Sequence, residues 1–174
     1  MAVARNPLRN VQAVCFDWGG TLMSEDGPTD VPMAMWPAVA AIEGAREALD
    51  ALSGSVPLAI ATNASVSTSS EVEQALSRVG LGGRFAHVFA FADLGIRKAE
   101  PEFWQIVSRE LGVPLPRLAM LGDSLEADVR HPRRFGVQAV WFNPTGESPL
   151  PSETIPTVRR LVEFAGWVKE AVRR

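Results

Sequence analysis

Short apolar runs that alternate with helix-patterned segments restrict the fold of this chain more than any other feature. The runs are nearly continuous in apolar character, and they lie at Ala13–Phe16, Pro57–Ala61, His87–Ala90, Leu118–Leu121 and Ala139–Phe142. Continuous apolar character is typical of parallel strands that are covered by helices on both faces. Strands that alternate with helices predict right-handed crossovers and one open parallel sheet, so we expect a three-layer, Rossmann-like α/β fold.

Apolar residues at helical spacing fill the intervals between these runs. The segments in which they predict helices are residues 45–52, 72–79, 103–111 and Leu125–Phe135. Three glycines follow or end helices at positions that favour a positive φ, namely Gly80, Gly112 and Gly136. A last helix is expected over about Thr157–Arg173, and its apolar stripe favours docking on the core over binding of a partner.

Two segments do not fit this alternation. Met23–Ala38 is rich in Pro, Met, Asp and Gly, which indicates a flap or lid. Asn143–Pro156 is interpreted as a loop because it contains Pro144, Pro149, Pro151 and Pro156. The length of 174 residues is typical of one domain, so the sequence predicts a single domain over residues 1–174.

The composition of the sequence restricts the cellular location and the binding partners that we expect. A net charge of −3 gives no support for a nucleic acid or a membrane surface as partner. The N-terminus carries no apolar signal segment, and no stretch approaches the ~20 apolar residues of a membrane span, so we expect a cytoplasmic protein. Cys15 is the only cysteine of the sequence, which excludes an internal disulfide and indicates a packed side chain.

Polar residues follow the ends of the predicted strands. Asp17 follows the first strand, and a buried carboxylate is costly unless a metal, a helix N-terminus or a hydrogen-bond network stabilises it. Thr62 and Asn63 follow the second strand, where a hydroxyl and backbone N–H groups suit a phosphate oxygen. Capping of a helix, for which Ser65 also qualifies, is the commoner role of such residues.

A lysine and two further carboxylates complete the pattern. Lys98 lies just before a helix expected to begin near Pro101; a surface lysine is the common alternative, and the adjacent Arg97 competes for a cationic role. Asp123 follows the fourth strand and Asp128 comes five residues later, which suits a hard divalent cation or, alternatively, helix capping and surface charge. Because ligands of open parallel sheets bind beyond the carboxyl ends of the strands, we expect these side chains to meet in one crevice.

Four segments, in this order, resemble the motifs of the haloacid dehalogenase-like (HAD) superfamily of phosphohydrolases. They are VCFDWGGTL, LAIATN, GIRKAEPEFW and MLGDSLEADV. The third differs from the family pattern in having Ala99 where the family has a proline. The resemblance extends over most of residues 11–143 and indicates a fold far more specifically than a substrate.

The resemblance implies a role for each matching residue. Asp17 would attack phosphorus and form an aspartyl-phosphate. Thr62, Asn63 and Lys98 would bind the transferring phosphoryl oxygens. Mg²⁺ would be held by Asp17, Asp123 and the backbone carbonyl of Gly19, with Asp128 assisting directly or through water.

Gly19 departs from the family pattern. Most phosphatases of the superfamily carry a second Asp at this position, which protonates the leaving group and then deprotonates the hydrolytic water. General acid–base catalysis contributes roughly 10²–10⁴-fold, so we expect slow turnover that depends on the leaving group. Glu25 or Asp26 in the flap, the substrate itself, or water are alternative sources of the proton.

The spacing of the motifs leaves little room for a cap. Asp17 and Thr62 are 45 residues apart, Thr62 and Lys98 are 36 apart, and core elements fill most of both intervals, so no full cap domain fits. By analogy, a capless site is open to a bulky phosphorylated substrate, small molecule or macromolecule, or is covered by a neighbouring subunit in a homodimer. Trp18 and Trp36 either line the rim of this site or pack in the core.

The sequence therefore predicts a slow Mg²⁺-dependent phosphohydrolase. The main alternative is a non-catalytic protein that binds phosphate or a phosphoprotein with the same residues. Dehalogenation or phosphonate cleavage at Asp17 is a lesser alternative.

Overall fold

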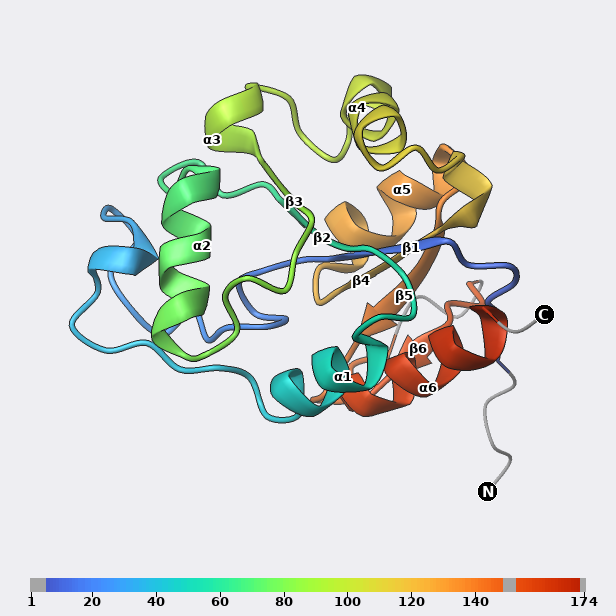
Figure 1. Cartoon of the computed structure of the whole chain (residues 1–174), viewed down its shortest axis with the longest axis horizontal. Helices are drawn as coiled ribbons and strands as arrows, with labels where there is room; N and C mark the ends of the chain where they lie inside the picture. The colour runs from blue at the N-terminus through green and yellow to red at the C-terminus, as the bar shows by residue number, and fades with distance from the viewer. Residues whose placement is uncertain (1–5, 149–152, 173–174) are drawn as a thin grey trace.

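The structure, a computed structural model, describes residues 6–148 and 153–172. Six parallel strands form a sheet in the order β3-β2-β1-β4-β5-β6 (Figure 1). Their bounds are β1 Ala13–Phe16, β2 Leu58–Thr62, β3 His87–Ala90, β4 Leu118–Gly122, β5 Gln138–Phe142 and β6 Thr157–Val158. The predicted parallel α/β sheet is confirmed.

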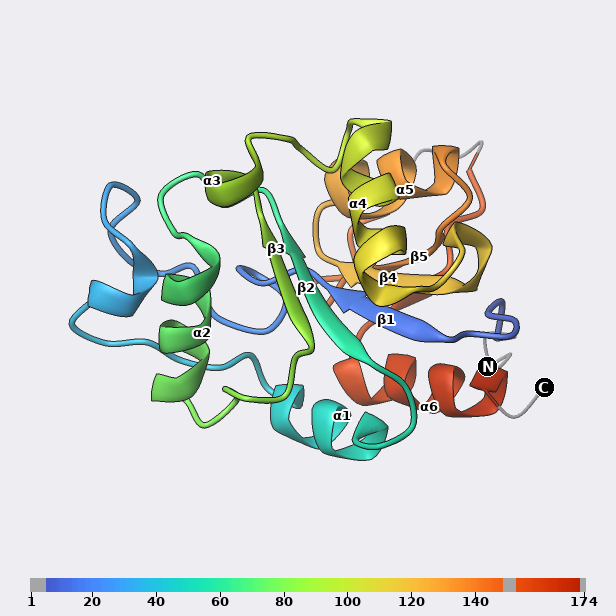
Figure 2. The same ribbon diagram turned by 45° about the horizontal axis from the view of Figure 1, so that its top comes forward.

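Helices cover both faces of this sheet. The α-helices are α1 Ala45–Leu52, α2 Ser69–Arg78, α3 Phe91–Leu94, α4 Pro101–Leu111, α5 His131–Arg134 and α6 Leu161–Val172. The other helical segments of the described residues are the 3-10 turns η1 Met33–Met35 and η2 Leu115–Arg117 and a π-helical stretch, η3 Leu125–Arg130. Helices α4 and α5 lie on one side of the sheet, and α1 and α6 lie side by side on the other (Figure 2). None of the helices in the described ranges has the length and apolar character needed to cross a bilayer.

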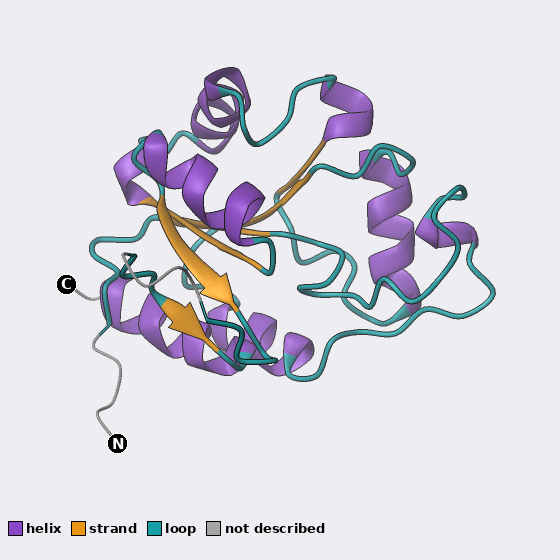
Figure 3. Ribbon diagram, turned by 180° about the vertical axis from the view of Figure 1, so that it is seen from behind, coloured by secondary structure: helices purple, strands orange, loops and turns teal. Residues whose placement is uncertain are grey.

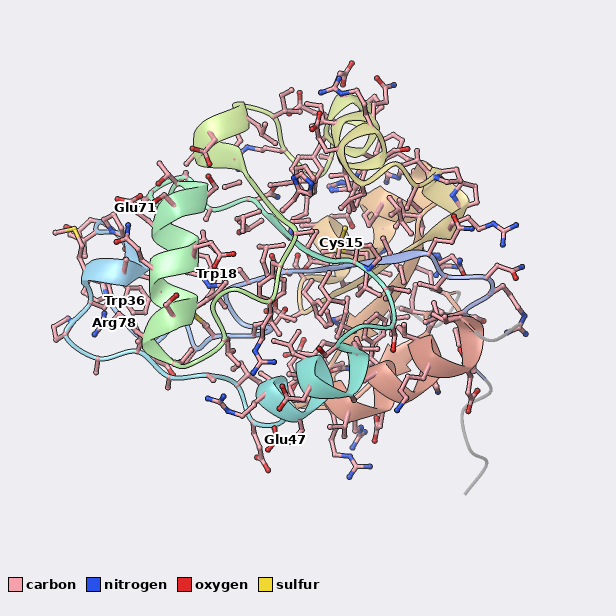
Figure 4. The ribbon with its side chains drawn as sticks, in the orientation of Figure 1. Cys15, Trp18, Trp36, Glu47, Glu71 and Arg78 are labelled. Carbon is pink, nitrogen blue, oxygen red and sulfur yellow. The ribbon has the colours of Figure 1, made fainter. Side chains whose placement is uncertain are left out.

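The side chains of β1 alternate between two apolar layers. Val14 and Phe16 pack with residues of α1, α2 and α6, whereas Ala13 and Cys15 face the layer that contains Trp104 of α4. Cys15 is fully buried (Figure 4), and this burial raises the pKa of its thiol to about 12, so it is an inert packing residue, as predicted. Because both faces are covered, functional side chains are left to the carboxyl edge of the strands.

The C-terminal helix begins later than predicted. Thr157 and Val158, which were expected to open it, instead form β6 and pair with Trp141 and Phe142 of β5 at the edge of the sheet (Figure 3). Two β-branched residues favour this extended pairing over a first helical turn. The helix starts at Leu161 and packs against α1, as expected for a docked helix. The predicted end at Arg173, and Pro149 and Pro151 of the preceding loop, lie outside the described residues.

The helix predicted over Leu125–Phe135 is divided into η3 and α5. Pro132 has no N–H to donate to the carbonyl of Asp128, four residues earlier, so a regular α-helix cannot run through this point. The three glycines predicted to end helices all have a positive φ: Gly80, Gly112 and Gly136.

The segment Met23–Ala38, predicted as a flap, packs against α2. Met33 and Trp36 are buried, and the Arg78 guanidinium of α2 donates hydrogen bonds to the carbonyls of Ala34 (3.0 Å) and Trp36 (2.7 Å). Figure 4 shows Trp36 and Arg78 together beside this helix. The part of the segment around η1 is therefore held to the body of the domain.

Candidate active site

A cavity of about 390 Å³ lies at the carboxyl edge of the sheet. Its lining includes every side chain predicted to meet there: Asp17, Thr62, Asn63, Lys98, Asp123 and Asp128. The residues come from the ends of β1, β2 and β4, from the turn before α4, and from η3. The parallel register of β1 with β2 and β4 brings these ends to the same edge.

Lys98 is the centre of a buried ion-pair cluster. Only 2% of the residue is exposed, which contradicts the surface alternative. Its Nζ donates to Asp17 Oδ1 (2.8 Å), Asp128 Oδ1 (2.6 Å) and the Ala61 carbonyl (2.9 Å). Burial would lower the pKa of Lys98, but Asp17 and Asp128 outweigh this effect and hold the pKa above its ordinary value. The three N–H groups of the ammonium thus have three acceptors.

The backbone around Lys98 is held as firmly as its side chain. The Lys98 N–H donates to Asn63 Oδ1 (3.0 Å), and the Lys98 carbonyl accepts from Trp104 Nε1 (2.9 Å). Arg97 is not a competitor for the cationic role, because its guanidinium lies 4.0 Å from the centroid of the Phe91 ring and does not line the cavity.

Three carboxylates face this single lysine. Oxygen atoms of Asp17, Asp123 and Asp128 lie within 4.8 Å of one another. Burial and the nearby charge of Asp17 raise the pKa of Asp123 to about 6. Carboxylate oxygens gathered at this spacing, with more negative than positive charge, fit a hard divalent cation such as Mg²⁺.

Thr21 links two of these carboxylates and was not identified in the sequence. Its Oγ1 lies 3.1 Å from Asp123 Oδ1 and 3.5 Å from Asp17 Oδ2, and it accepts from the Asp123 N–H (3.1 Å). The signal was a hydroxyl placed directly after Gly19-Gly20, at the turn that follows the first strand. Gly20 has φ +75°, and a Cβ there would lie 2.5 Å from Asp123 Oδ2, so this turn requires glycine.

Asp128 is fully buried and both of its oxygens are engaged. Oδ1 accepts from Lys98 Nζ, and Oδ2 accepts from the Ser124 N–H (2.9 Å). Burial and the charge of Asp17 raise the pKa of Asp128, whereas Lys98 opposes the shift. A Cβ on Gly122 would lie 2.2 Å from Asp128 Oδ2, so glycine at the end of β4 lets this carboxylate pack against the strand. Ser124 is the N-cap of η3, so Asp123 does not cap this helix, whereas Asp128 does accept from the N-cap N–H and the capping alternative holds for it in part.

Thr62 is the last residue of β2, and Asn63 follows it directly. Thr62 Oγ1 accepts from the Ala64 N–H (3.1 Å), which leaves its own O–H available to the cavity. Helix α2 begins only at Ser69 and is capped by the Thr68 side chain. The N-cap interpretation of Thr62, Asn63 and Ser65 is therefore wrong, because several residues of turn separate them from the helix.

A second cavity of about 320 Å³ adjoins the first. The residues common to both linings are Trp18, Glu25, Ala64 and Ser65. Trp18 and Trp36 pack in the core, with 3% and 8% exposure, and also line this second cavity. Trp18 therefore both packs in the core and lines the cavity of the predicted site, whereas Trp36 packs in the core and lines only the adjoining cavity.

Residues 34–136 match the family model of haloacid dehalogenase-like hydrolases. The chain belongs to this family. Among curated proteins, this HAD-like hydrolase is 35% identical over 80 residues to a phosphoserine phosphatase of Thermus thermophilus, a match that covers 46% of this chain and 32% of the relative. It is 30% identical over 70 residues to the pyrimidine 5′-nucleotidase PynA of Streptococcus pneumoniae, covering 40% of this chain and 30% of the relative. The matches thus span about a third of each relative's length.

Solved structures share the fold of this HAD-like hydrolase. An uncharacterized protein from Listeria monocytogenes serotype 4b superimposes with a TM-score of 0.79 at 21% identity, covering 94% of this chain and 100% of that one. The HAD-hydrolase YfnB from Bacillus subtilis, solved with bound magnesium, gives a TM-score of 0.74 at 18% identity, covering 91% and 98%. The 2-haloacid dehalogenase from Pseudomonas syringae pv. Tomato DC3000 gives 0.75 at 16% identity, covering 92% and 99%.

Proposed function

We propose that this HAD-like hydrolase is a Mg²⁺-dependent phosphohydrolase with Asp17 as its nucleophile. The observation that carries the proposal is the meeting of Asp17 with Lys98, Thr62 and two further carboxylates around one cavity. The names of both curated relatives, a phosphoserine phosphatase and a pyrimidine 5′-nucleotidase, support a phosphorylated substrate.

The proposed chemistry begins with a carboxylate that is held for attack. Lys98 fixes Asp17 through Oδ1, which leaves Oδ2, on the side of Thr21, to form the bond to phosphorus. The new P–O bond replaces the bond to the leaving group and gives an aspartyl-phosphate, which water then hydrolyses. The O–H of Thr62 and the amide N–H groups of Asn63 would donate to the phosphoryl oxygens, and the positive charge of the nearby Lys98 ammonium would offset their negative charge.

Mg²⁺ would be held by Asp17, Asp123 and the carbonyl of Gly19. Within residues 6–148 and 153–172, no hydrogen bond to the Gly19 carbonyl is found, so this oxygen is available as a ligand. Both oxygens of Asp128 are engaged, which favours assistance through Lys98 or water over direct ligation. When bound, the ion neutralises charge between the attacking carboxylate and the phosphate.

We also propose that the site works without a separate cap domain. The interval between Asp17 and Thr62 is used by η1, α1 and β2, and the interval between Thr62 and Lys98 by α2, β3 and α3. The segment Met23–Ala38 and the cavity beside it would then contact the organic part of the substrate.

A hydrolysis assay tests the proposal. We expect phosphate release from p-nitrophenyl phosphate and acetyl phosphate with Mg²⁺, and loss of this activity when EDTA is added. Calorimetry with phosphate or beryllofluoride is the companion measurement. Binding of these anions without turnover on either substrate would contradict the proposal and favour a non-catalytic phosphate-binding protein.

We expect Mg²⁺ to stabilise the folded chain. At a concentration ~100 times its Kd, the ion should raise the free energy of unfolding by about 2.7 kcal/mol, because the assembled carboxylates exist only in the folded state. The apparent affinity should increase as the pH rises through about 6, since Asp123 must lose its proton to bind the ion. Thermal unfolding during a Mg²⁺ titration measures both effects.

Matched variants locate the stabilising ion. Asp123→Asn should lose most of the Mg²⁺-dependent stabilisation, whereas Asp30→Asn, which removes an exposed carboxylate that does not line the cavity, should keep it. Equal stabilisation of both variants would place the bound ion elsewhere.

A further inference from the structure

We propose that Glu25 is the acid–base residue of this site and replaces the side chain that Gly19 lacks; the inference rests on the proposed function. The carboxylate of Glu25 occupies the space next to Gly19. A Cβ on Gly19 would lie 2.2 Å from Glu25 Oε1 and 2.8 Å from its carboxyl carbon. The φ of Gly19 is outside the left-handed region, so its backbone would accept a side chain if Glu25 moved away.

The backbone before Glu25 is fixed by a tight turn. The Met23 N–H donates to the Trp18 carbonyl (3.1 Å), and the Ser24 N–H donates to the Ala40 carbonyl (2.9 Å). Met23 is fully buried, and its sulfur accepts a hydrogen bond from Trp18 Nε1 (3.2 Å). These contacts fix the backbone of residues 23 and 24 close to Gly19. The Glu25 side chain therefore extends into the site from a defined backbone position.

Glu25 stands where the two cavities meet. It lines the cavity that contains Asp17 and also the one that contains Trp18 and Trp36. A phosphate ester with its phosphoryl group beside Asp17 and its organic group in the second cavity would have its bridging oxygen next to Glu25. The side chain is solvent-exposed at this boundary, and within the described ranges its carboxylate makes no hydrogen bond, so it is available to a substrate.

Asp26, the neighbouring carboxylate, has a different environment. Its Oδ2 accepts a hydrogen bond from Ser24 Oγ (2.7 Å), and the residue lines neither cavity. Of the two acidic residues that the sequence offered as substitutes, the geometry selects Glu25.

In this mechanism Glu25 gives a proton in the first step and takes one back in the second. In the first step an oxygen of Asp17 bonds to phosphorus, the bond from phosphorus to the ester oxygen breaks, and the carboxylic acid of Glu25 gives its proton to that oxygen. In the second step the Glu25 carboxylate takes a proton from water, whose oxygen bonds to phosphorus as the bond to Asp17 breaks. An alcohol and inorganic phosphate are released, and both carboxyl groups return to their starting states.

The Glu25→Gln variant tests the inference through its dependence on the leaving group. With Mg²⁺, we expect hydrolysis of an alkyl phosphate to fall by ~10²–10³-fold, because a poor leaving group needs the proton. Hydrolysis of p-nitrophenyl phosphate, whose leaving group departs unprotonated, should fall far less. Asp26→Asn should keep the wild-type ratio between the two substrates. A merely structural role of Glu25 would lower both rates together and leave their ratio unchanged.

A double substitution supplies the complementary test. Gly19→Asp combined with Glu25→Ala places a carboxylate in the vacated space and should recover alkyl phosphate hydrolysis relative to Glu25→Ala alone. Gly19→Asp in the otherwise unchanged chain should gain less, because the two side chains compete for the same space.

The outcomes separate the two proposals. An unchanged substrate ratio in Glu25→Gln, with activity that still requires Asp17, overturns the role of Glu25 alone. Activity that is independent of Asp17, or no turnover of any phosphate by the wild-type chain, overturns the proposed function and the role of Glu25 with it.

Discussion

The Asp17→Asn variant is expected to lose Mg²⁺-dependent hydrolysis of aryl and acyl phosphates by ~10³-fold or more, on the scale seen when a nucleophile is removed. A carboxamide oxygen is neutral and cannot form the aspartyl-phosphate that the proposed mechanism needs. Steady-state rates of phosphate release for the wild-type chain and the variant measure the loss. Equal rates for the two proteins would show that Asp17 is not the nucleophile.

Stability distinguishes this catalytic effect from damage to the fold. The Asp17→Asn side chain keeps an oxygen that can accept the hydrogen bond from Lys98, and the substitution removes a negative charge that raises the pKa values of Asp123 and Asp128. In EDTA, the free energy of unfolding of the variant should therefore equal or exceed that of the wild-type chain. This trade of stability for function is common where like charges are held together for catalysis. A variant that loses activity only because it unfolds would show the opposite change.

The parallel sheet and the convergence of polar residues at the carboxyl ends of its strands could be predicted because local sequence patterns determine them. Continuous apolar runs identify buried parallel strands, and the crossover rule places their ends at one edge. Asp17, Lys98 and Asp123 therefore share a cavity although each, taken alone, has a common structural explanation.

Features that depend on tertiary contacts could not be predicted in the same way. Thr157 and Val158 continue a helical pattern in the sequence, yet in the structure they pair with the edge strand β5 as the short strand β6. Threonine is a common helix cap, so Thr62 is a reasonable candidate in the sequence. Helix α2, however, begins only at Ser69 and is capped by Thr68. The position of Glu25 also depends on the hydrogen bond from the Ser24 N–H to the carbonyl of Ala40, which is distant in sequence, so the sequence could name Glu25 and Asp26 as candidates without choosing between them.

The Lys98→Met variant is expected to lose ~3–5 kcal/mol of unfolding free energy in EDTA. Methionine fills a similar volume but leaves the buried carboxylate of Asp128 and the Asp17 carboxylate without their shared cation. A single domain is stable by only ~5–15 kcal/mol, so this loss is large and should lower Tm by roughly 10 °C or more. Denaturant unfolding monitored by circular dichroism and fluorescence measures it directly.

A neighbouring residue supplies the control. Arg97→Met removes an exposed guanidinium whose contact is the face of Phe91, and such a contact is worth only ~0.5–1 kcal/mol. Both variants remove one positive charge, and from adjacent positions. The difference between their free energies of unfolding therefore measures the effect of burial and ion pairing and not that of net charge.

The double variant Lys98→Met with Asp128→Asn decides whether the loss comes from the unpaired carboxylate. Breaking a buried ion pair from one side leaves a charge without a partner, whereas replacing both sides removes the charge together with its cation. The double variant should thus be more stable than Lys98→Met alone, and the carboxamide that Asp128→Asn introduces keeps an oxygen able to accept from the Ser124 N–H. If the two losses instead add, or if Lys98→Met costs no more than Arg97→Met, then the buried cluster does not depend on Lys98 for its charge balance. The positive charge that offsets the carboxylate of Asp17, the proposed nucleophile, and the two further carboxylates would then have to come from another group.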